Sequence, residues 1–127
     1  MDYAQILAKN PRDLMEWLLE EFTVEIPHEI ITTDDMDEAA SLMMQLSSYF
    51  SYLCTLSSYA KIATREVKRE GDKMAYEDMV DRKEIIQNML DAVKQQYSAV
   101  SRAVTVRIEN NNELRMNSGG YIRDTSV

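Results

Sequence analysis

The stretch REVKREGDKMAYED, residues 65–78, decides the fold because it holds the only glycine or proline between residues 28 and 118. Glycine destabilises a helix interior, whereas most of the residues flanking it form helices readily. A long helical chain would therefore reverse direction at Gly71-Asp72.

An apolar heptad pattern runs on each side of this break. Apolar positions recur in alternating steps of three and four residues, the spacing of a coiled-coil seam. The first seam comprises Ala39, Leu42, Leu46, Tyr49, Leu53, Leu56, Ala60, Ala63 and Val67. The second comprises Tyr76, Met79, Lys83, Ile86, Leu90, Val93, Tyr97, Val100 and Val104.

The two seams match as an antiparallel hairpin, because the numbers of facing residues add up to about 143 throughout. The alternative, one unbroken helix, would need a partner chain along its whole length. We predict an all-α protein whose long, coiled-coil-like helical hairpin spans residues 34–112. An acidic N-terminal helix and connection at 1–33 precede it, and a mobile polar tail at 113–127 follows. The helix of the second seam should reach at least Val104 and end near Asn110 to Asn112.

The N-terminal segment contains a helix start at Asn10, where Asn can cap, Pro11 suits the first turn and Asp13 occupies the third position. Apolar residues then fall on one face, which predicts an amphipathic helix; they are Leu14, Trp17, Leu18 and Phe22. The following TVEIPHEIITT, residues 23–33, predicts an extended connection. Thr33 or Asp34 can cap the first long helix.

Composition and charge bound the class of protein. One domain is expected from 127 residues. The net charge is −8, but residues 1–40 carry eleven acids and two bases, and the rest of the chain is nearly neutral. The single cysteine, Cys54, cannot form an internal disulfide, and we expect it to pack as a small apolar side chain. Neither a signal peptide nor a spanning apolar run is recognisable, so we expect a cytoplasmic protein.

Catalysis finds little support in the sequence. His28 is the only histidine, and no recognised nucleophile, phosphate-loop or metal motif is present. The acids of DDMDEAA, residues 34–40, lack the spacing of a calcium loop and suit a helix N-terminus instead. We therefore expect no enzyme activity, no cofactor and no metal.

Basic residues gather where the first long helix ends. Lys61, Arg65, Lys68 and Arg69 share one helical face, and Lys73 lies just across the turn. Such clusters bind phosphates, but bases at a helix C-terminus also complement its dipole without any further role. Glu66 and Glu70 are close enough in sequence to neutralise part of the cluster.

Two further patterns suggest that the chain associates with itself. Small polar residues stripe the first helix at Ser47, Ser51, Thr55 and Ser58, which could mark either an oligomer interface or a solvated face. A hairpin alone also leaves apolar residues beside its seam uncovered: Phe50, Tyr52, Tyr59, Ile62, Ile85 and Met89. The N-terminal helix could cover some of them, and a homo-oligomer would cover the rest.

Three stretches carry a family resemblance: KIATREVKREGDK before the turn, YEDMVDRKEII after it, and YSAVSRAVTVRIE further along. This layout resembles the UvsY-like recombination mediators of tailed phages over residues 40 to 110. The resemblance implies a helical homo-oligomer that binds single-stranded DNA and helps to load a recombinase. The DNA-contacting residues would then be Lys61, Arg65, Lys68, Arg69 and Lys73.

The acidic N-terminal third points to another class of protein. An acidic phage counter-defence inhibitor could occupy the basic groove of a host nucleic-acid-binding effector. A scaffolding hairpin without any nucleic-acid role is a third interpretation. Arg102 lies off the seam, where we expect an intramolecular or subunit contact.

Overall fold

The computed structural model describes residues 2–25 and 36–118 as four helices without a strand. They are α1 (Tyr3–Leu7), α2 (Pro11–Phe22), α4 (Met36–Glu70) and α5 (Lys73–Ser118). Most of the predicted connection, His28 and the predicted caps at Thr33 and Asp34 lie outside the described residues. The all-α prediction is confirmed.

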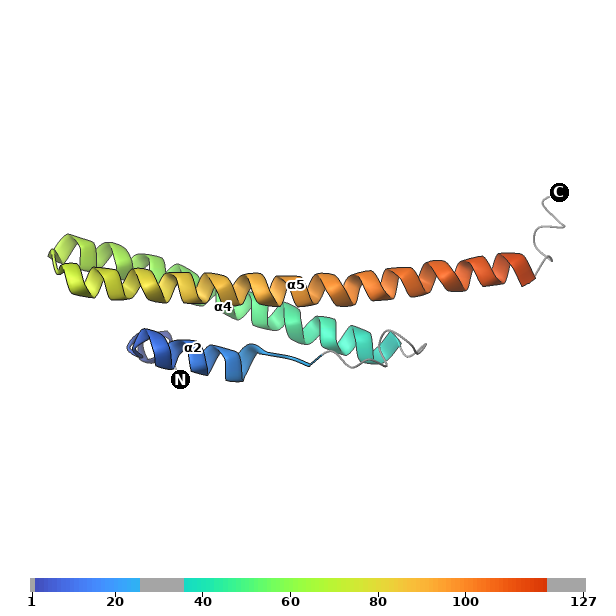
Figure 1. Cartoon of the computed structure of the whole chain (residues 1–127), viewed down its shortest axis with the longest axis horizontal. Coiled ribbons are helices and arrows are strands. Elements are labelled where there is room, and N and C mark those ends of the chain that lie inside the picture. Colours follow the sequence, from blue (N-terminus) through green and yellow to red (C-terminus); the bar gives the residue numbers. More distant parts are fainter. Residues whose placement is uncertain (1, 26–35, 119–127) are drawn as a thin grey trace.

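The predicted hairpin is also confirmed, with α4 and α5 lying antiparallel on each other (Figure 1). The turn falls at Gly71, whose φ of 81° is a left-handed conformation that glycine adopts without strain. Asp72 then caps α5, because its carboxylate accepts a hydrogen bond from the backbone N–H of Ala75 at 3.1 Å.

The predicted seams form most of the contact between α4 and α5. On α4, seam residues that are at most 1% exposed are Ala39, Leu46, Leu53, Leu56 and Ala60. On α5, Ile86, Leu90, Val93 and Val100 are buried. Tyr97 departs from the pattern, since 36% of it remains exposed although it occupies a seam position.

The predicted end of the second long helix at Asn110 to Asn112 is wrong, because α5 continues to Ser118. Nothing before Gly119 breaks the helix, and asparagine costs at most about 0.7 kcal/mol per residue relative to alanine. With 46 residues against the 35 of α4, α5 projects past the first residue of α4 (Figure 1).

The short helix α1 was not predicted. Asp2 caps it and accepts the backbone N–H of Gln5 at 2.8 Å, while the Gln5 side chain accepts the backbone N–H of Asp2 at 3.0 Å. This reciprocal pair is a capping box. The D-x-x-Q spacing was visible in the sequence, but the helix that it starts has only five residues.

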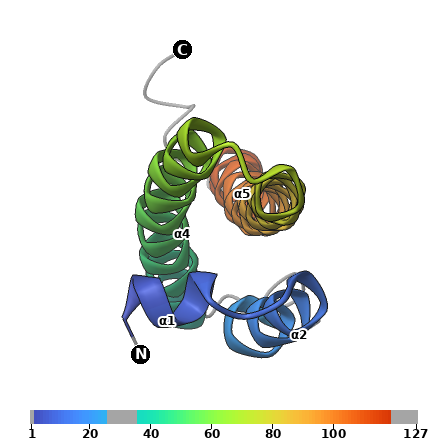
Figure 2. The ribbon, with the colours of Figure 1, turned by 90° about the vertical axis from the view of Figure 1, so that its left-hand side faces the viewer.

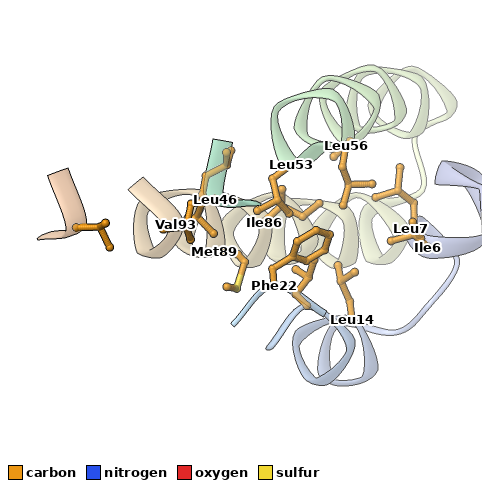
Figure 3. Packing of buried hydrophobic residues seen from close by; sticks show 14 of the residues in the cluster. Ile6, Leu7, Leu14, Phe22, Leu46, Leu53, Leu56, Ile86, Met89 and Val93 are labelled. Atoms are coloured by element: carbon orange, nitrogen blue, oxygen red, sulfur yellow. The ribbon is translucent and has the colours of Figure 1, made fainter. Parts of the chain in front are cut away.

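Both N-terminal helices pack on one side of the hairpin, α1 against α4 and α2 against α5 (Figure 2). Phe22 from the end of α2 contacts the rings of Tyr49 and Tyr52, with centroids 5.1 and 5.4 Å apart. Tyr3 of α1 stacks on Tyr59 at 4.8 Å. Figure 3 shows Leu14 and Phe22 reaching into the same apolar cluster as Leu53 and Ile86 of the hairpin.

Two side chains of α5 fix the direction of α2. The Nε–H of Arg82 donates to the backbone carbonyl of Lys9, and the side-chain amide of Gln96 donates to that of Val24, both at 2.8 Å. Lys9 precedes α2 and Val24 follows it, so α2 runs parallel to α5. These bonds hold both ends of α2 against the hairpin.

Candidate nucleic-acid interface

Only one of the two sides of the α4–α5 hairpin is covered by other described helices. Helix α2 packs over Ile85, Met89 and Gln96, which leaves the other side of the hairpin without a helix from the described part of the chain. A groove follows that uncovered side in two connected hollows of about 310 and 340 Å³. We call it the open groove. Its lining includes Ser47, Phe50, Cys54 and Lys61 of α4 and Asp91, Lys94 and Tyr97 of α5, so one acid lies between its two lysines.

The five predicted site residues lie at the hairpin end, which we call the basic end. Lys61, Arg65, Lys68, Arg69 and Lys73 are all exposed. Within residues 2–25 and 36–118, none of the five makes an ion pair. Helical geometry places Lys61, Arg65 and Lys68 on the same side of α4 as the open groove, and Lys61 lines the hollow of about 340 Å³. Arg69 lies further round the helix.

Two acids of the hairpin end, Glu66 and Glu70, lie on another side of α4. Glu66 borders a hollow with Tyr3 and Ala4 of α1, and Glu70 follows one helical turn later on the same side. The sequence suggested that Glu66 and Glu70 neutralise part of the basic cluster. Among the described residues, however, neither forms an ion pair with a base of the cluster. Residues 61–78 contain five bases and five acids. The open-groove side of α4 is basic there because Lys61, Arg65 and Lys68 lie on it and Glu66 and Glu70 do not.

The acidic side chains of α2 also lie away from the open groove. Glu16, Glu20 and Glu21 are exposed on α2, which packs on the covered side of the hairpin. Arg12 pairs with Glu16 at 3.5 Å, but both side chains are solvated and the pair contributes little. The acids of α2 therefore lie on the side of the hairpin opposite Lys61 and Arg65.

Two aromatic residues of the open groove were not predicted as site residues. Phe50 and Tyr97 are 39% and 36% exposed and line the same hollow, beside Lys94. Phe50 was expected only to need cover, and Tyr97 was assigned to the seam. A tyrosine among aliphatic seam residues was the available signal, because its hydroxyl favours a place at the edge of a core.

Cys54 also differs from expectation, because it is exposed in the open groove instead of packed among apolar residues. Its small neighbours on α4 are largely hydroxyl-bearing. The Ser58 hydroxyl donates to the Cys54 carbonyl at 3.1 Å, and the Thr55 hydroxyl donates to the Ser51 carbonyl at 3.2 Å. Three members of the small-residue stripe, Ser47, Ser51 and Ser58, line the open groove.

Other kinds of site find no support among residues 2–25 and 36–118. No group of three or more His, Cys, Asp or Glu side chains there could share a metal ion. No helix in those ranges combines the length and apolar character that crossing a membrane requires. No family model matches the chain, and no curated protein or solved structure is significantly similar to it.

Proposed function

We propose that the protein is a non-enzymatic accessory protein of phage DNA recombination or replication that binds single-stranded DNA at its basic end. The observation that supports this proposal is the segregation of charge. Lys61, Arg65 and Lys68 are exposed and unpaired within the described residues, on a side of α4 that the acidic helix α2 does not share. The resemblance to UvsY-like mediators points to the same residues and adds a recombinase as protein partner.

Binding would depend on phosphate contacts. Lys and Arg side chains reach backbone phosphates from an exposed helix face without reading base edges, so sequence selectivity should be low. If all five basic-end residues contact phosphates of a single strand, the logarithm of the binding constant should fall with the logarithm of salt concentration with a slope of about −3.5. A polyanion is repelled by acidic surfaces, so it should approach the basic end from the side away from α2.

The test measures the affinity of two double charge-reversal variants for a labelled oligo-dT, by fluorescence anisotropy at low salt. Arg65→Glu with Lys68→Glu changes the net charge by −4 within the basic end. Arg12→Glu with Arg102→Glu makes the same change at exposed positions outside it. We expect a loss of affinity of about tenfold or more from the first pair and a much smaller loss from the second.

Equal losses from the two pairs would show that binding follows net charge and not this site. A broader variant combines the reversals of Lys61, Arg65, Lys68 and Arg69. Binding that survives all four would contradict the site altogether.

A second candidate function rests on the exposed acids of α2. As an acidic counter-defence inhibitor, the protein would present Glu16, Glu20 and Glu21 to the basic groove of a host effector and would not bind DNA itself. Capture of such an effector from host lysate, lost on Glu16→Lys with Glu20→Lys, would favour this function. An absence of both activities would leave the scaffolding interpretation.

A further inference from the structure

The middle of α4 carries a large apolar side chain between small ones. Phe50 is 39% exposed, and Ser47, Ser51 and Cys54 surround it on the side of the open groove. Small side chains let a second helix approach closely, and an exposed ring supplies apolar area to bury. This part of α4 therefore has the shape of a helix-packing surface with no helix of the described chain on it.

Two hydroxyl groups of this part of α4, those of Thr55 and Ser58, do not oppose burial. Ser58 and Thr55 already donate to backbone carbonyls one turn earlier in their own helix. Burying a hydroxyl costs free energy mainly when its hydrogen bond is lost. Another helix could therefore cover Thr55 and Ser58 without leaving either hydroxyl unpaired.

The charges at the two ends of α4 indicate which partner fits. Its first turn carries Asp37 and Glu38, and its last turn carries Lys68 and Arg69. A second α4 lying antiparallel would place each acidic start near a basic end, whereas a parallel one would place like charges together. Leu53 marks the middle of α4, and the open groove extends to both sides of this level.

We propose that the open groove is the contact between two copies of this chain, with α4 packed antiparallel on α4 of the second copy around a two-fold axis near Leu53. Phe50 of each copy enters the groove of the other, and the two α5 helices flank the pair as in a four-helix bundle. Helices that cross at about 20° diverge toward their ends. The end charges then favour the antiparallel direction, and of the five basic-end residues only Lys61 lines the open groove itself.

This contact uses the middle of α4, so it does not rest on DNA binding. Both of its tests are made without nucleic acid, and DNA binding by a monomer would contradict the contact but not the proposed function.

The first test matches two neighbouring substitutions. Ser47 and Ser48 are both exposed, but only Ser47 lines the open groove. We expect Ser47→Arg to raise the dissociation constant of the dimer by about tenfold or more, measured by sedimentation, and Ser48→Arg to leave it nearly unchanged. A monomeric wild-type protein, or a dimer that both variants leave intact, would overturn the proposal.

The second test uses the native cysteine. Cys54 lies close to the inferred two-fold axis, so a short bis-maleimide should join two copies of the wild-type protein. In the control, Cys54→Ser is combined with Asn88→Cys, which moves the thiol to an exposed position beside α2. We expect no covalent dimer from that control. Cross-linking through position 88 but not through Cys54 would place the contact on the other side and overturn the proposal.

Discussion

The two sides of the α4–α5 hairpin are built from the same kinds of residues but have different neighbours. On the covered side, Phe22 of α2 contacts Tyr49 and Tyr52, and 6% of it stays exposed. On the open side, Phe50 lines a groove that no described helix fills. The covered side therefore contributes to the stability of the fold, whereas the open side is available for binding.

The largest expected effect separates two phenylalanines. Phe22→Ala should lower the free energy of unfolding by about 3 kcal/mol, because it empties a packed aromatic cluster. Phe50→Ala should cost about 1 to 1.5 kcal/mol in dilute, monomeric protein, because Phe50 is 39% exposed and its loss leaves no enclosed cavity. Urea unfolding followed by circular dichroism measures both, and similar losses would contradict the distinction between the sides.

A smaller effect is expected where α2 is attached to the hairpin. Arg82→Leu removes the hydrogen bond to the Lys9 carbonyl and should cost about 1.5 kcal/mol. The matched control is Arg102→Leu, which changes an exposed arginine that makes no hydrogen bond or ion pair within the described residues. Hydrogen exchange should show faster exchange in α2 for the first variant and an unchanged rate for the second.

The cap of α2 should contribute less again. Asn10→Ala removes the acceptor for the backbone N–H of Asp13 at 2.8 Å and should cost about 1 kcal/mol. Asn10→Ser keeps a capping oxygen and should restore most of that stability in thermal unfolding. A serine variant as unstable as the alanine variant would argue against capping as the cause.

The smallest effect concerns pH. Burial, and then the nearby Tyr3 and Glu21, raise the pKa of Tyr52 above its ordinary value of 10.0. The folded state thus favours the protonated phenol. The contribution of Tyr52 to the free energy of unfolding is therefore fully present below pH 10 and is lost as the pH rises through the raised pKa. Tyr52→Phe should remove this part of the alkaline loss in unfolding titrations, and an unchanged pH dependence would contradict the assignment.

Local signals explain why the hairpin could be predicted from the sequence. A single Gly71 between two matched heptads determines the turn, and each seam repeats one short-range rule. The side that α2 takes could not be predicted in this way. It depends on Arg82 and Gln96 reaching backbone carbonyls 73 and 72 residues away, and no periodicity encodes such contacts.

The candidate site was predictable to the same extent. The basic end could be found because Lys61, Arg65 and Lys68 follow helical spacing. The open groove could not, because the exposure of Phe50 and Tyr97 depends on which side the N-terminal helices leave uncovered. The positions of Glu66 and Glu70 relative to the basic cluster could not be predicted either, because they depend on which side of α4 faces α1.

The mass of the protein in solution, measured by light scattering with and without oligo-dT at low salt, tests the account most directly. If the open side carries both the contact between copies and the basic end, the protein alone should have about twice the chain mass of 14.7 kDa. Adding the oligonucleotide should increase that mass further, and high salt should reverse the increase. A protein that remains monomeric and does not bind DNA would contradict both proposals.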